Sequence, residues 1–158
     1  MPEGDLEAVR AQIAVLTDRT AVSEVPLRYA RGVDRRDWDL VRSCFTADAF
    51  VQGSRTTAPL DQYLDILQPG VERYPTTMHF MGNQLVELTG DIAWVETYAV
   101  AFHFAGDPPG CSHPEDLVLG VRYHDTVERR AGSWKISHRQ VDADWQRSAP
   151  EPDREARP

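Results

Sequence analysis

Four long β-type runs fill the second half of the sequence and restrict the possible folds more than any other feature. They span Thr76–Leu88, Ile92–Phe104, Leu117–Glu128 and Ser133–Trp145. A Thr-Gly-Asp turn joins the first two runs and an Ala-Gly turn joins the last two, which indicates two β-hairpins. Strands of roughly a dozen residues exceed the usual length of about five or six, so the sheet must curve strongly or contain bulges. Gly82 and Gly120 are the expected bend points.

Helical periodicity fills the first 45 residues. An apolar stripe predicts an amphipathic helix over residues 5–17. A second helix is expected to begin at residues 18–20, to bend at Pro26, because proline lacks an N–H, and to end at Gly32. A third, short helix is predicted from Trp38 to about Phe45.

Shorter elements complete the chain. Residues 48–53 read as a strand, and Leu60–Leu67 as a short helix closed by Pro69-Gly70. Gly106–Pro114 is predicted to be a loop. One domain over residues 1–147 is expected, and the tail Ser148–Pro158, rich in proline and charge, should be disordered. Helices followed by antiparallel strands indicate an α+β fold, in which helices cover the concave face of a curved sheet and the resulting cone encloses a pocket.

The charge and composition exclude several function classes. Lys+Arg number 17 and Asp+Glu 25, a net charge of −8. That sign disfavours a nucleic-acid partner, because phosphate backbones repel an acidic surface. The longest apolar run, Tyr98–Phe102, is far short of a membrane span. The acidic N-terminus does not resemble a secretory signal, and two cysteines, Cys44 and Cys111, cannot form a disulfide framework, so we expect a cytoplasmic protein.

Three residues could carry chemistry: Tyr29, Asp34 after a predicted helix end, and His79 in the first long strand. A carboxylate beside an imidazole fixes the tautomer of the ring and turns histidine into a base near neutral pH. Each residue alone is more often a core tyrosine, a turn carboxylate or a structural histidine. Cys111-Ser-His113 lacks enough ligands for a zinc site, and phosphate-loop and dinucleotide motifs are absent, so we expect neither metal nor cofactor.

Three sequence blocks resemble a known family. Arg28–Trp38, Thr77–Asn83 and Glu128–Ile136 are similar, in the same order, to the SnoaL-like branch of the nuclear-transport-factor-two-like superfamily. The resemblance implies an α+β cone with three N-terminal helices. It is strongest to the group holding scytalone dehydratase, bile-acid 7α-dehydratase and hexachlorocyclohexane dehydrochlorinase, in which an Asp–His pair removes a carbon-bound proton.

The resemblance also implies roles for individual residues. His79 matches the general base and Asp34 the carboxylate that orients it, while Tyr29 matches a tyrosine of the bile-acid enzyme. The expected substrate-binding residues are His103, Arg139 and Tyr123. One tyrosine of scytalone dehydratase falls on Val33, so scytalone itself is not the expected substrate.

The resemblance implies a small-molecule lyase, most directly a dehydratase acting on a carbonyl-activated or polycyclic compound. The alternatives are an isomerase, cyclase or epoxide hydrolase of polyketide- or steroid-like compounds, a non-catalytic ligand-binding protein, and a small subunit of an oxygenase. The expected substrate is largely apolar and neutral or mildly anionic. Relatives are usually trimers or dimers, so a homo-oligomer is expected.

Overall fold

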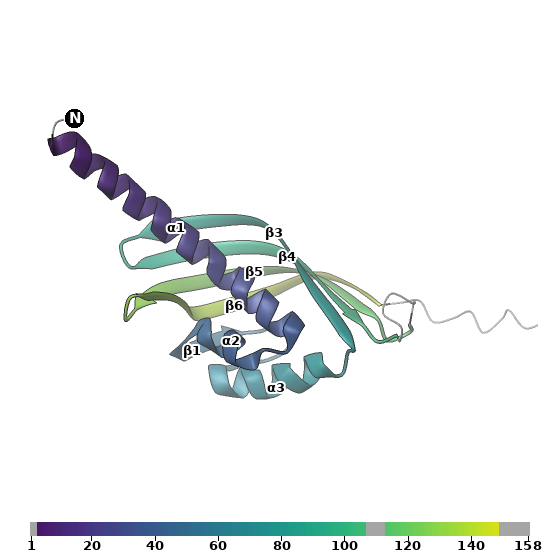
Figure 1. The fold of residues 1–158 in the computed structure, drawn as a ribbon. Helices are drawn as coiled ribbons and strands as arrows, with labels where there is room; N and C mark the ends of the chain where they lie inside the picture. Colours follow the sequence, from purple (N-terminus) through teal and green to yellow (C-terminus); the bar gives the residue numbers. More distant parts are fainter. Residues whose placement is uncertain (1–2, 107–112, 149–158) are drawn as a thin grey trace, which may run out of the picture.

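The computed structural model describes residues 3–106 and 113–148 and has the α+β architecture expected from the sequence (Figure 1). Its elements in chain order are α1 (Glu3–Arg35), α2 (Trp38–Ser43), β1 (Phe45–Gln52), β2 (Thr57–Pro59), α3 (Leu60–Glu72), β3 (Thr76–Thr89), β4 (Ile92–Phe104), β5 (Leu117–Arg130) and β6 (Ser133–Ser148). Both predicted hairpins, β3–β4 and β5–β6, are present. Most of the predicted tail, and Cys111, lie outside the described residues.

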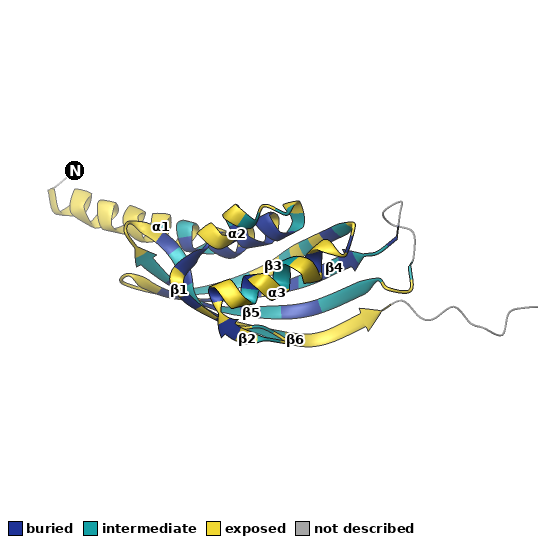
Figure 2. Cartoon of the chain, turned by 90° about the horizontal axis from the view of Figure 1, so that it is seen from below, coloured by how far each residue is buried: buried dark blue, intermediate teal, exposed yellow. Residues whose placement is uncertain are grey.

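A single six-stranded sheet forms the body of the molecule. The strand order is β2-β1-β6-β5-β4-β3, and the pairing is antiparallel except between β1 and β6. The sheet has free edges at β2 and β3, so it curves without closing into a barrel. Helix α1 lies against β3, β4 and β6, and α3 lies against β1 and β2. Buried residues therefore gather between the helices and one face of the sheet (Figure 2).

The long strands bend at the two glycines that the sequence singled out. The β3–β4 register shifts between Met81 and Gln84, around Gly82, and the β5–β6 register shifts directly after Gly120. The indole of Trp145 covers Gly120 so closely that a Cβ there would overlap the ring. These irregularities curve strands that would otherwise be too long for a flat sheet.

Helix α1 is one continuous helix of 33 residues, whereas the sequence suggested two. Pro26 lies inside it, and its side chain is fully buried. Proline removes one hydrogen bond, but packing of the buried stripe holds the helix together across this point. Gly32 does not end the helix either. A Cβ at Gly32 would lie 2.8 Å from Cγ2 of Val41, so glycine permits the close approach of α2 to α1.

The end of α1 is fixed by the residue that follows it. Arg36 adopts a left-handed backbone conformation with φ of 58°. Its guanidinium donates hydrogen bonds to Thr77 Oγ1 at 2.7 Å and to the carbonyl of Tyr74 at 2.8 Å. These contacts join the last turn of α1 to the start of β3. Asp37 then caps α2, as expected, by accepting from the N–H of Leu40 at 3.0 Å.

Two surfaces remain uncovered. The first turns of α1 project beyond the sheet and are exposed (Figures 1 and 2). On the sheet face away from the helices, the side chains of Phe80, Trp94 and Trp145 are exposed. The homo-oligomer expected from the resemblance stays a prediction. None of the described helices is apolar over a stretch long enough to span a membrane.

Gly32→Ala should destabilise the fold by about 1–3 kcal/mol, because the added methyl group overpacks the α1–α2 contact. Gly4→Ala is the matched control in the same helix: nothing lies near its Cβ position, and alanine favours the helix by up to about 1 kcal/mol. Urea unfolding of both variants measures the difference. Equal stabilities would contradict the close approach described for Gly32.

Candidate functional site

Asp34 and His79 form a two-point contact between the last turn of α1 and strand β3. Asp34 Oδ1 lies 2.7 Å from Nδ1 of His79, and Asp34 Oδ2 accepts the backbone N–H of His79 at 2.8 Å. The side chain of His79 is 7% exposed and that of Asp34 is 21% exposed. The Arg36 contacts to Thr77 and Tyr74 bring these two segments together. The structure thus joins the two residues that the sequence proposed as a pair.

The electrostatics of this pair favour an ionised carboxylate. Burial opposes ionisation of Asp34, but the hydrogen bonds and charge of His79 outweigh it and hold the pKa of Asp34 below its usual value. An ionised Asp34 only accepts hydrogen bonds, so Nδ1 of His79 carries a proton, and in the uncharged form of the ring Nε2 keeps a free lone pair. His79 also lines a cavity. The arrangement can therefore take up a proton from a bound molecule and stabilise the imidazolium that forms.

The cavity beside His79 has a volume of about 100 Å³ and a lining of mixed character. Its polar groups come from Tyr29, Ser54, Tyr63, His79, His103 and Tyr123, and the other lining residues are Val33, Leu67, Val71, Ala101, Leu119, Val121 and Val141. An outer pocket of about 250 Å³ adjoins it and shares Tyr63, His103 and Leu119 with it. Four of the predicted site residues, Tyr29, His79, His103 and Tyr123, thus line one space, and Asp34 stands behind His79.

His103 projects from β4 on the same face as His79. Thr77 pairs with His103 and His79 pairs with Ala101, so both rings extend from one face of neighbouring strands, with centroids 6.0 Å apart. Nδ1 of His103 is buried and has no hydrogen-bond partner within the described chain. Burial, followed by the nearby charge of His79, lowers the pKa of His103 to about 4. At neutral pH His103 is therefore an uncharged imidazole.

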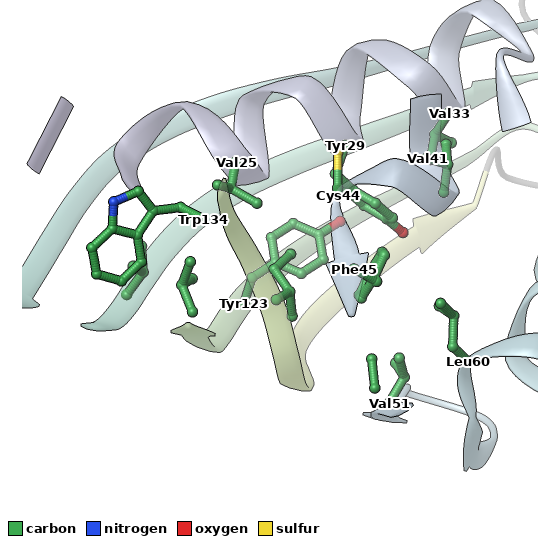
Figure 3. Close-up of a cluster of buried hydrophobic side chains, with 14 of the residues drawn as sticks. Val25, Tyr29, Val33, Val41, Cys44, Phe45, Val51, Leu60, Tyr123 and Trp134 are labelled. Atoms are coloured by element: carbon green, nitrogen blue, oxygen red, sulfur yellow. The ribbon is translucent and has the colours of Figure 1, made fainter. Parts of the chain in front are cut away.

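Arg139 lies behind the cavity wall. Its Nε and one terminal nitrogen each donate to Asp125 at 2.7 Å, and both side chains are fully buried. The guanidinium lies 4.1 Å from the ring centre of Tyr29 and 4.5 Å from that of Tyr123. Figure 3 shows Tyr29, Tyr123 and Phe45 close together in the hydrophobic core. For Arg139 to contact a substrate, as the sequence predicted, one of these tyrosine rings must move aside.

The tyrosines of the cavity are uncharged hydrogen-bonding groups. Burial raises the pKa of Tyr29, and the positive charge of Arg139 opposes part of that rise. Burial likewise raises the pKa values of Tyr63 and Tyr123. Neutral phenols can donate a proton or a hydrogen bond to an oxygen of a bound molecule.

Sequence reasoning missed Tyr63 and gave Asp125 no part in the site. Tyr63 lies on α3 with the inward-facing Leu60, Leu64 and Leu67, so the helical spacing could have placed it on the inner side. Asp125 becomes visible only through the strand register, because Asp125 is paired with Arg139 across β5 and β6.

Comparison with protein families agrees with the observed fold. Residues 14–140 match the SnoaL-like domain, so the chain belongs to the SnoaL-like domain family. The uncharacterized protein Rv2910c of Mycobacterium tuberculosis is 27% identical over 141 residues, covering 85% of this chain and 90% of that protein.

Solved structures with the same fold include two named for elimination chemistry. A candidate scytalone dehydratase from Novosphingobium aromaticivorans has a TM-score of 0.75 and 20% identity, covering 87% of this chain and 91% of that one. Hexachlorocyclohexane dehydrochlorinase LinA-type3 from Novosphingobium barchaimii has a TM-score of 0.74 and 19% identity, covering 89% and 96%. At these identities the likeness establishes the fold, which is the one that the sequence blocks implied.

Removing one member of the buried ion pair should be costly. Asp125→Leu leaves the guanidinium of Arg139 buried without a counter-charge and should lower the free energy of unfolding by about 3–5 kcal/mol. The double variant Asp125→Leu/Arg139→Met should recover much of this loss, because it buries no charge. Chemical denaturation measures the free energy of unfolding of both variants. A double variant less stable than Asp125→Leu would contradict the prediction.

The uncharged state of His103 should show in the pH dependence of stability. An unfolded chain takes up a proton at this histidine near its ordinary pKa of 6.5, whereas the folded protein does so only near 4. The unfolded state therefore binds more protons between these values, and stability falls as the pH drops through this window. In His103→Gln, the free energy of unfolding should depend less steeply on pH, because the number of protons taken up on unfolding falls by up to one. Urea unfolding at pH 6.5 and 4.5 measures this difference. An unchanged slope would show that His103 is not held neutral.

Proposed function

We propose that this protein is a cofactor-independent lyase that removes water from a small carbonyl-activated compound. The observation that carries the proposal is the contact of Asp34 with both the ring and the backbone of His79, at the wall of a cavity that also holds buried phenols. A free imidazole nitrogen beside neutral hydrogen-bond donors is what a carbon-acid elimination requires.

The reaction begins at His79. Its Nε2 takes a proton from the carbon next to the carbonyl group of the substrate, and Asp34 stabilises the resulting imidazolium. The electron pair of the broken C–H bond first moves toward the carbonyl oxygen and gives an enolate. It then forms a carbon–carbon double bond as the carbonyl group is restored and the C–O bond of the neighbouring hydroxyl breaks. Tyr29 supplies a proton to the departing oxygen, which leaves as water. The proton held by His79 then returns to the phenolate, so the protein ends unchanged.

The remaining polar groups suit binding of the carbonyl oxygen. His103 is neutral and keeps one N–H, and Tyr63 and Tyr123 keep their phenolic protons. Donors held in a buried site stabilise the negative charge that develops on the carbonyl oxygen more effectively than water does. Each well-placed acid or base contributes about 10²–10⁴-fold to the rate.

One observation favours catalysis over ligand binding alone. A binding protein needs no ordered carboxylate–imidazole pair, whereas here Asp34 and His79 lie 2.7 Å apart. Double-bond isomerisation uses the same proton abstraction and returns the proton to another carbon. The mass of the product separates the two, because dehydration loses one water and isomerisation keeps every atom.

Asp34→Asn and His79→Gln should each lower turnover by about 10²-fold or more while the protein stays folded. The assay is a panel of aromatic β-hydroxy ketones incubated in D₂O, with water loss followed by mass spectrometry and exchange at the activated carbon followed by NMR. Tyr29→Phe should slow the loss of water and retain the exchange. Thermal unfolding of each variant is the control, and full activity of both Asp34→Asn and His79→Gln would overturn the assignment.

A further inference from the structure

Two arginines stand at the outer end of the pocket that leads to His79. Arg55 lies between β1 and β2, and Arg73 directly follows α3. Both line the pocket of about 250 Å³ that adjoins the inner cavity, and both also line an adjoining hollow of about 420 Å³. A molecule bound in the pocket of about 250 Å³ therefore lies beside both arginines. Neither residue was a candidate from the sequence.

A continuous row of side chains connects Arg73 with the proposed base. The guanidinium carbon of Arg73 lies 4.6 Å from the ring centre of Tyr74. The ring of Tyr74 lies 5.0 Å from that of His103, and the ring of His103 lies 6.0 Å from that of His79. Two rings, Tyr74 and His103, thus separate the positive charge at the mouth from the imidazole that takes the proton.

The lining of the pocket of about 250 Å³ differs in charge from the whole chain, because it contains two arginines and, among the described residues, no carboxylate. The protein carries a net charge of −8, yet within residues 3–106 and 113–148 neither Arg55 nor Arg73 forms an ion pair with a carboxylate. Two carboxylates, Glu115 and Asp116, line the hollow of about 420 Å³, and the oxygens of Asp116 accept the backbone N–H groups of Ala105 and His113 at 2.8 and 3.0 Å. In the pocket of about 250 Å³, Arg73 donates a hydrogen bond to the hydroxyl of Tyr74, and both guanidinium groups can pair with an anionic ligand there.

We propose that the substrate is an aromatic or polycyclic carboxylate, whose anionic group binds between Arg55 and Arg73 at the pocket mouth. The planar guanidinium matches the two oxygens of a carboxylate, and it is the side chain best suited to hold one. The apolar body of the substrate then extends along Tyr74 and His103 and places the reacting carbon at His79. The inference rests on the proposed function for its reacting end, and the carboxylate itself takes no part in the elimination.

The test compares two probes of nearly the same shape, the anion 2-naphthoate and the uncharged 2-naphthamide, by isothermal titration calorimetry at low ionic strength. We expect 2-naphthoate to bind at least tenfold more tightly than the amide, and added salt to reduce the difference. Arg73→Gln and Arg55→Gln should each weaken 2-naphthoate binding and leave 2-naphthamide binding unchanged. The double variant should bind both probes equally.

Arg10→Gln is the matched control, because it removes the same charge from the exposed part of α1, away from the pocket. It should bind both probes as the wild-type protein does. Leu119→Trp, which fills the space shared by the outer pocket and the inner cavity, should abolish binding of both and so locate the probes. Thermal unfolding confirms that each variant is folded.

Three results would overturn the proposal: failure of 2-naphthoate to bind, equal affinity for the two probes, or wild-type affinity for 2-naphthoate in the Arg55→Gln/Arg73→Gln variant. Turnover is not measured in these titrations. The preference for an anion can therefore hold while the proposed elimination fails, and the elimination can hold while the preference fails.

Discussion

The buried ion pair of Arg139 and Asp125 is the constraint on which the centre of the molecule depends. Two charges without exposed surface are stable there only because they neutralise each other and because aromatic rings surround the guanidinium. Those rings come from α1, β1 and β5, so the pair fixes the distance between the helix layer and the sheet. The same rings of Tyr29 and Tyr123 face the cavity on their other side. A structural charge thus sets the position of the groups that the proposed reaction uses.

Asp34 joins fold and chemistry in a second way. Its two oxygens hold the backbone and the ring of His79, so the end of α1 cannot move without turning the imidazole. Precise placement of a base comes from such packing and hydrogen bonding rather than from the base itself. The left-handed residue Arg36, which ends α1 and bonds to Tyr74 and Thr77, is therefore part of the support of the site. Its guanidinium also donates to the carbonyls of Val33 and Val71, two residues that line the cavity.

The parts of this structure that could be predicted from sequence are those determined locally. The hairpins and the bends at Gly82 and Gly120 follow from turn residues and strand length. The continuity of α1 through Pro26 could not be foreseen, because tertiary packing there outweighs a local penalty. Asp34 and His79 were paired through the family resemblance, since spacing alone left them unconnected. The proximity of Arg55 and Arg73 could not be predicted from the sequence, because the two residues belong to separate chain segments that meet only at the pocket.

The single parallel pairing of the sheet has a consequence for the order of assembly. Strand β1 pairs with β6, so the two partners are separated along the chain by α3 and three other long strands. During synthesis from the N-terminus, Phe45 and Tyr29 emerge long before Arg139, the charge they surround. Strand β6, which completes the pocket wall, leaves the ribosome after the other five strands of the sheet, and long-range closure of this kind slows folding. A nascent chain thus contains Asp34 and His79 before β6, and it acquires the complete pocket wall only once β6 has been made.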